Sequence, residues 1–115
     1  MAENFLYLTT TGRKSGAPRQ IEIWFVEYGG HHYIVSERRH ESQWVKNIHS
    51  CPQVHFSVGT RTAQETVLGR SPARARVVDA AAEPALAQKV QALMDAKYDW
   101  SNGLIVELIR EAAAS

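Results

Sequence analysis

The sequence has 115 residues, of which 44% are hydrophobic and 22% charged, and its formal net charge at pH 7 is +1. This size and composition are typical of one globular domain, which we expect to span residues 1–115. The small net charge argues against a general nucleic-acid or membrane-surface binder, which usually carries a broad basic excess.

The N-terminal part of the sequence predicts three strands. Phe5–Thr10 is a mostly apolar run with the length of a buried strand. Arg19–Tyr28 alternates apolar and polar residues, a period of two that indicates a strand with one face in a core. Gly29 and Gly30 predict a type I′ hairpin turn, which needs positive φ at both central positions, and His31–Ser36 is then the returning strand. Short turns between successive strands are typical of an antiparallel meander.

A short helix and a further strand follow. From Glu41 the apolar residues take a helical spacing, and Pro52 disfavours helix in the residue before it. Trp44 and Asn47 are three residues apart and therefore share one side of this helix. Gln53–Val58 alternates again and predicts a strand whose apolar residues face inward: Val54, Phe56 and Val58.

The remaining strands are less sharply defined. Thr62–Leu68 fits a strand that pairs with a second one at Ala73–Val78, around a turn rich in glycine and proline. Leu104–Ile109 is apolar and β-branched enough for a strand, but the alanine-rich tail behind it also permits a helix.

The clearest helix is Ala81–Tyr98, whose apolar residues recur at helical spacing. It is expected to start near Ala82, because Pro84 is tolerated only in the first turn. The elements together predict a mainly β (α+β) fold of six or seven mostly antiparallel strands with one short and one long helix. A small barrel with accessory helices buries such strands best, because closing a sheet removes its edges.

A basic loop connects the first two predicted strands. In the stretch Leu8–Phe25, the loop between the two strands holds three cations, Arg13, Lys14 and Arg19, and no acid. Two glycines and a proline bend the loop, and Ser15 adds a hydroxyl. A rigid loop with clustered cations and hydroxyls is suited to a bound phosphate or carboxylate. The alternative is a solvated hairpin turn that is merely basic.

Other kinds of site find little support. The five histidines match no zinc-binding spacing, so we expect no metal. Cys51 is the only cysteine, which excludes an internal disulfide, and it lacks the surroundings of a reactive thiol. No nucleophile triad, phosphate-binding P-loop or dinucleotide motif is visible. No apolar run approaches the ~18 residues of a membrane span, and no signal peptide precedes Phe5, so we expect a cytoplasmic protein.

An ordered set of motifs resembles a known family. It comprises LTTTGRKSGAPR at Leu8–Arg19, a strand ending in Trp24, the glycine hairpin, a strand ending in Ser36, and W-x-x-N at Trp44–Asn47. The set resembles the deazaflavin (F420)-dependent nitroreductase and quinone reductase family, within the FMN-binding split β-barrel superfamily that also holds pyridoxamine phosphate oxidases. Under this resemblance the fold is a split β-barrel and Leu104–Ile109 becomes a strand.

The resemblance implies a redox cofactor, F420 or alternatively FMN, along one side of the barrel. The resemblance assigns nine residues to the cofactor site, where they contact its phosphate and acidic tail, the strand along which it lies, or its ring. They are Arg13, Lys14, Ser15, Arg19, Trp24, Val35, Ser36, Trp44 and Asn47. Tyr98 matches a tyrosine beside the reacting ring. Its role is either that of a catalytic phenol or that of a hydrophobic plug at the end of the helix.

The sequence departs from the family pattern near the expected pocket. Glu37 stands where a cation is usual, although Arg38 offers a charge from the next position. Glu22 places a carboxylate on the strand where a Pro-Leu pair is common. These differences leave the choice between F420 and FMN open.

The function that the resemblance implies is a reductase. It would transfer a hydride from the reduced cofactor to a small electron-poor acceptor, such as a quinone, an enone or a nitroaromatic. The alternatives are a non-catalytic barrel that carries a flavin, haem or lipid, and a partner-binding barrel with a degenerate site. A homodimer is a further expectation, since split barrels of this superfamily often form one.

Overall fold

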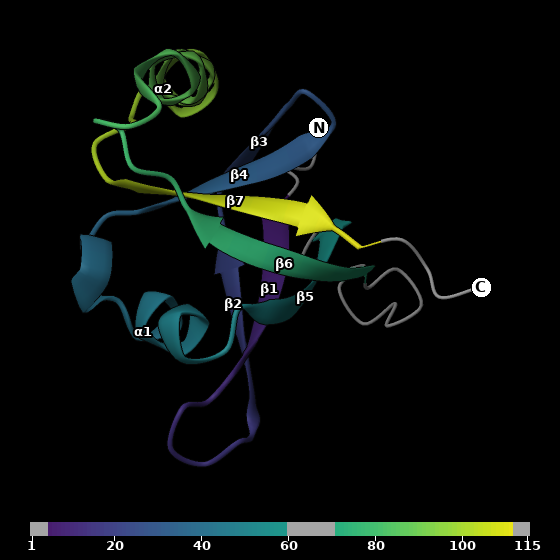
Figure 1. Ribbon diagram of the computed structural model, residues 1–115. Coiled ribbons are helices and arrows are strands. Elements are labelled where there is room, and N and C mark those ends of the chain that lie inside the picture. Colours follow the sequence, from purple (N-terminus) through teal and green to yellow (C-terminus); the bar gives the residue numbers. More distant parts are fainter. Residues whose placement is uncertain (1–4, 60–70, 112–115) are drawn as a thin grey trace.

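The computed structural model describes residues 5–59 and 71–111 (Figure 1). Seven strands form one antiparallel sheet in the order β2-β1-β5-β6-β7-β4-β3, which curls into a half-barrel. The strands are β1 (Phe5–Thr11), β2 (Pro18–Ile23), β3 (Phe25–Tyr28), β4 (His31–Ser36), β5 (Gln53–Gly59), β6 (Ser71–Val77) and β7 (Leu104–Arg110). The helices are the 3-10 turn η1 (Arg39–Glu41), α1 (Gln43–Ser50) and α2 (Pro84–Tyr98). The predicted split-barrel architecture is confirmed.

The outer strands of the sheet, β2 and β3, are consecutive in the chain. β2 pairs with β1, and β3 pairs with β4. The chain therefore passes from one edge of the sheet to the other at Trp24, which belongs to neither strand. The prediction of one continuous strand over residues 19–28 is therefore wrong. The alternating pattern continues through Trp24, but the chain changes hydrogen-bonding partners there.

The β3–β4 hairpin forms as predicted. Gly29 and Gly30 have φ of +60° and +83°, the conformation that a type I′ turn requires. The strand at residues 104–109 is confirmed as β7, which lies between β6 and β4. The predicted strand at residues 62–68 lies outside the described residues.

Two apolar clusters occupy the two faces of the sheet. One gathers inward side chains of β1, β4, β5 and β7 with Ile48 of α1. The other lies between the sheet and α2, whose Val90 and Met94 are fully buried. Val54 and Phe56 face the first cluster as predicted, but Val58 is 41% exposed. Val58 pairs with the buried Leu6 and so lies on the predicted inward face, but it is not buried because β5 continues past the edge of the core.

A charged network ties α2 to the sheet. Arg76 on β6 donates to both carboxylate oxygens of Glu83, just before α2, at 2.6 and 3.2 Å, and to Glu107 on β7 at 3.0 Å. The Tyr33 hydroxyl donates to Glu107 at 2.5 Å. Burial alone would raise the pKa of the Glu107 carboxyl, but the hydrogen bonds from Tyr33 and Arg76 bring that pKa below its ordinary value. Burial and the bond to Glu107 raise the pKa of Tyr33.

Candidate functional site

The β1–β2 loop is fixed by its own hydrogen bonds. The Gly12 amide donates to the Ala17 carbonyl at 2.8 Å, and the Gly16 amide donates to the Gly12 carbonyl at 2.8 Å. The Ser15 hydroxyl oxygen accepts from the Ala17 amide at 3.2 Å. The loop projects from the sheet on the side of α1 (Figure 1). Its cations are therefore presented from a defined backbone, as a bound anion requires.

Helix α1 holds Arg13 in place. The Asn47 side-chain oxygen accepts from the Arg13 guanidinium at 3.0 Å and from the Arg13 backbone amide at 3.3 Å. Gln43 accepts from the other end of the guanidinium at 2.8 Å. The Asn47 amide nitrogen donates to the Thr10 hydroxyl at 3.2 Å, and Asn47 is only 5% exposed. The helix face predicted from W-x-x-N thus contacts the loop.

A cavity of about 420 Å³ lies between the loop and α1, and we call it the loop cavity. None of the residues lining it is acidic: Thr10, Gly12, Arg13, Lys14, Ser15, Arg19, Ile21, Gln43, Trp44 and Asn47. Three cations and several hydroxyl and amide groups therefore converge in a lining that has no carboxylate among the described residues. This environment favours an anionic ligand.

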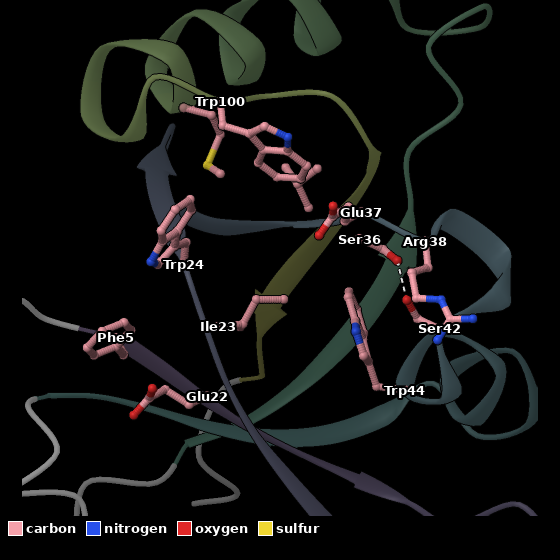
Figure 2. A pocket seen from close by; sticks show the side chains of 12 residues that line it. Phe5, Glu22, Ile23, Trp24, Ser36, Glu37, Arg38, Ser42, Trp44 and Trp100 are labelled. Atoms are coloured by element: carbon pink, nitrogen blue, oxygen red, sulfur yellow. Dashed lines mark hydrogen bonds between the residues drawn. The ribbon is translucent and has the colours of Figure 1, made fainter.

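A second cavity of about 660 Å³, the tryptophan cavity, lies further along β2. Its lining residues are Phe5, Glu22, Ile23, Trp24, Val35, Ser36, Glu37, Arg38, Ser42, Trp44, Met94 and Trp100. Figure 2 shows Trp24 and Trp100 on one side of this cavity and Trp44 on the other. Trp44 lines both cavities, so they are adjacent, and we call the two together the groove, with a cationic end and an aromatic end.

The end of β4 forms the floor of the tryptophan cavity. The buried Ser36 hydroxyl donates to the Arg39 carbonyl at 2.8 Å and accepts from the Ser42 hydroxyl at 2.6 Å (Figure 2). Arg39 has φ of 54°, in the left-handed region, and its guanidinium donates to Asn102 at 3.1 Å. The Ser36 hydroxyl therefore holds the turn after β4 in its conformation, a role that the sequence does not reveal.

Tyr98 lies behind the wall of the tryptophan cavity and is not among its lining residues. Its ring stacks on Trp24, with ring centroids 4.5 Å apart and an interplanar angle of 2°. Its hydroxyl donates to the Phe25 carbonyl at 2.9 Å and accepts from the Phe25 amide at 3.1 Å. The catalytic role suggested for Tyr98 stays a prediction, and this geometry favours the structural alternative.

The nine residues predicted to bind the cofactor all line the groove. Arg13, Lys14, Ser15, Arg19, Trp44 and Asn47 line the loop cavity, and Trp24, Val35, Ser36 and again Trp44 line the tryptophan cavity. Glu22, Glu37 and Arg38, the departures from the family pattern, all line the tryptophan cavity. Arg38 therefore does not add its charge to the loop cavity.

Several lining residues escaped sequence reasoning. Gln43 could have been found, because it lies four residues before Asn47 and hence on the same helix face. Ser42, Met94 and Trp100 carry no local signal, since they reach the cavity only through the tertiary fold.

No metal centre or membrane helix is found in the parts of the chain that the structure describes. Within residues 5–59 and 71–111, no three side chains of the metal-ligating types converge. Over the same ranges, no helix has the length and hydropathy needed to cross a bilayer.

A family model described as "F420H(2)-dependent quinone reductase" matches residues 1–100. The chain belongs to this family. The predicted resemblance is thereby confirmed over most of the sequence. No curated protein sequence matches the chain.

Solved structures of split-barrel proteins share the fold of this family member. The haem storage protein HutZ from Vibrio cholerae superposes with a TM-score of 0.71 at 20% identity, covering 95% of this chain and 82% of HutZ. An FAD-binding protein from Mesorhizobium loti has a TM-score of 0.70 at 14% identity, with 96% and 83% covered. A structure described as an F420 reductase has a TM-score of 0.59 at 20% identity, with 94% and 86% covered.

Proposed function

We propose that this protein is an F420-dependent reductase that transfers a hydride to a small electron-poor acceptor such as a quinone, an enone or a nitroaromatic. The observation that carries the proposal is the groove, in which a rigid, acid-free cationic cavity adjoins a cavity walled by tryptophans. Family membership favours F420 over FMN as the cofactor.

The donor set of the groove fits a cofactor with a phosphate and an acidic tail. Arg13, Lys14 and Arg19 supply positive charge, and Ser15 supplies a hydroxyl beside them. Charge-assisted hydrogen bonds from such groups are stronger than neutral ones. The hydrogen bonds that the Arg13 guanidinium donates to Asn47 and Gln43 hold it in place before any ligand arrives. At the aromatic end, Trp44 and Trp24 offer flat apolar surfaces to a ring system.

Reduced F420 supplies a hydride when it is bound, and the protein supplies binding, orientation and exclusion of water. The loop cations and Asn47 would hold the anionic end of the cofactor in the loop cavity. Trp44, at the junction of the two cavities, separates the cationic end from the aromatic end. Glu22, Glu37 and Arg38 lie at the aromatic end, which therefore carries charges of both signs, unlike the loop cavity.

The proposal is tested by titrating the purified protein with F420, FMN, FAD and haem side by side. Tightest binding of F420, together with oxidation of reduced F420 when menadione is added, is the expected result. Tight binding of haem or a flavin without turnover would instead identify a carrier protein. Absence of affinity for all of these compounds would leave a barrel with a degenerate site and overturn the proposal.

A further inference from the structure

Trp24 forms a wall of the tryptophan cavity without support from a strand ladder. It is the single residue between β2 and β3, where the chain changes pairing partners. Its side chain is 39% exposed, so the core does not enclose it. A large aromatic side chain at such a junction needs another element to hold it in one orientation.

Tyr98 provides that support through its ring. The Trp24 and Tyr98 rings are 4.5 Å apart and within 2° of parallel, so the phenol covers one face of the indole. Trp24 also lines the cavity, whereas Tyr98 does not. The stack therefore places Tyr98 behind Trp24, where it contacts the wall and not the cavity.

The Tyr98 hydroxyl also fixes the backbone next to Trp24. β3 is an edge strand, and the hydroxyl bonds both the amide and the carbonyl of Phe25, as a neighbouring strand would. Lys97 donates to the same carbonyl at 3.0 Å and lies 4.0 Å from the centroid of the Phe25 ring. A phenol has one O–H proton, and here the Phe25 carbonyl accepts it, so none remains for an acceptor in the cavity.

The same turn of the chain contributes a second wall residue. α2 ends at Tyr98, its C-cap Asp99 takes the left-handed conformation with φ of 57°, and Trp100 then enters the lining of the cavity. Trp24 and Trp100 lie across the cavity from Trp44, which comes from α1 (Figure 2). The end of α2 thus supports one aromatic wall through Tyr98 and supplies Trp100 to it.

We propose that Tyr98 is a positioning residue, which fixes Trp24 as a wall of the tryptophan cavity, and that the resulting slot selects flat, conjugated acceptors over non-planar ones. Flat rings gain most from aromatic walls because their faces make full contact, whereas a puckered ring leaves gaps. The choice of acceptor rests on the proposed reductase function, but the positioning of Trp24 does not.

The first test needs no turnover. Tyr98→Leu removes both the stack and the hydrogen bonds, and Tyr98→Phe removes only the hydrogen bonds. We expect acrylamide quenching of tryptophan fluorescence to increase in Tyr98→Leu and the near-ultraviolet circular dichroism of the stacked pair to be lost, with Trp24→Phe identifying the Trp24 contribution. Tyr28→Leu is the matched control, since Tyr28 is an exposed tyrosine that does not line the cavity. Wild-type spectra in Tyr98→Leu would overturn the positioning role whether or not the protein is a reductase.

The second test measures kinetics with menadione, which is flat, and cyclohexenone, which is puckered. We expect KM for menadione to rise in both Tyr98→Phe and Tyr98→Leu, by about tenfold in Tyr98→Leu. In both variants kcat should stay within about twofold of the wild-type value. The menadione preference should fall, and the pH profile of kcat should be unchanged. A tenfold loss of kcat at unchanged KM in Tyr98→Phe would show a catalytic phenol and overturn the proposal. If Tyr98→Leu does not fold, Tyr98→Phe decides, and a wild-type KM for menadione in that variant would reject the proposal.

Discussion

Asn47 binds both the backbone amide and the guanidinium of Arg13, at 3.3 and 3.0 Å, through a single side-chain oxygen. The two residues are 34 positions apart, and the contact joins the basic loop to the buried face of α1. The loop that carries the positive charge is therefore built as one unit with the helix that closes the groove.

Asn47→Ala tests this connection. The change leaves the Arg13 guanidinium and the Thr10 hydroxyl without their buried partner, so we expect a loss of about 1–3 kcal/mol of stability. We also expect weaker F420 binding, because Arg13 loses its fixed orientation. Denaturant unfolding and a binding titration measure the two effects. Gln43→Ala is the control, since its bond to Arg13 is exposed, and an equal effect in both variants would show that burial of Asn47 is unimportant.

Lys14→Ala tests the cationic loop directly. Losing one charge-assisted hydrogen bond should weaken F420 binding by about 1–3 kcal/mol. The wild-type affinity should fall as salt rises, because the loop is exposed and its charges are screened. Lys89→Ala on the exposed side of α2 removes the same charge far from the groove and should leave the titration unchanged. Equal affinity in Lys14→Ala, Lys89→Ala and wild type would remove Lys14 from the site.

The elements that the sequence predicts well are those whose pattern is local. The glycine pair specifies its own turn, and Trp44 and Asn47 share a helix face whatever surrounds them. The basic loop is predictable for the same reason, because its turn residues and charges are adjacent in the sequence. Membership of the family then places these pieces along one groove.

The features that escaped prediction depend on contacts between distant residues. Nothing around Trp24 marks the change of partner, since its flanking residues continue the alternation of a strand. The contact between Phe25 and Tyr98 spans 73 positions, and it is this contact that determines where the phenol points. Val58 shows the limit of alternation alone, which gives the two faces of a strand but not the extent of the core.

The carboxyl group of Glu107 should make the stability of the fold depend on pH in the acidic range. Its pKa is lower in the folded protein than its ordinary value of 4.5, so the folded state binds fewer protons than the unfolded state. The stabilisation is complete above that pH and is lost as the pH falls below about 4.5. We expect Glu107→Gln to lower stability at neutral pH and to flatten this acid limb, as measured by urea unfolding from pH 7 to 3. Glu111→Gln, at an exposed position, should keep the wild-type pH dependence.

His32 should act over a higher pH range. Burial lowers the pKa of His32 below its ordinary value of 6.5, although the neighbouring Glu27 opposes the shift. Because the imidazole binds its proton less tightly in the folded state than in the unfolded state, stability should fall as the pH drops below about 6.5. His32→Gln is expected to remove the slope of stability against pH between about 6.5 and about 4.5, below which Glu107 acts. The exposed His55, changed to glutamine, serves as the comparison, and an identical slope in the two variants would contradict the assignment.

Gly103 determines how closely β7 approaches the floor of the tryptophan cavity. A Cβ atom at Gly103 would lie 2.4 Å from the Ser36 carbonyl oxygen and 2.6 Å from a methyl carbon of Val35, which is closer than packing allows. The carbonyl belongs to the backbone of β4, so the strands themselves would have to separate. We expect Gly103→Ala to lower the free energy of unfolding by about 1–3 kcal/mol and to weaken F420 binding, because Val35 and Ser36 line the cavity.

At Gly59 the same added atom meets nothing within 4 Å among the described residues, so Gly59→Ala should leave both quantities near their wild-type values. Wild-type stability and affinity in Gly103→Ala would mean that the end of β4 can move without disturbing the groove.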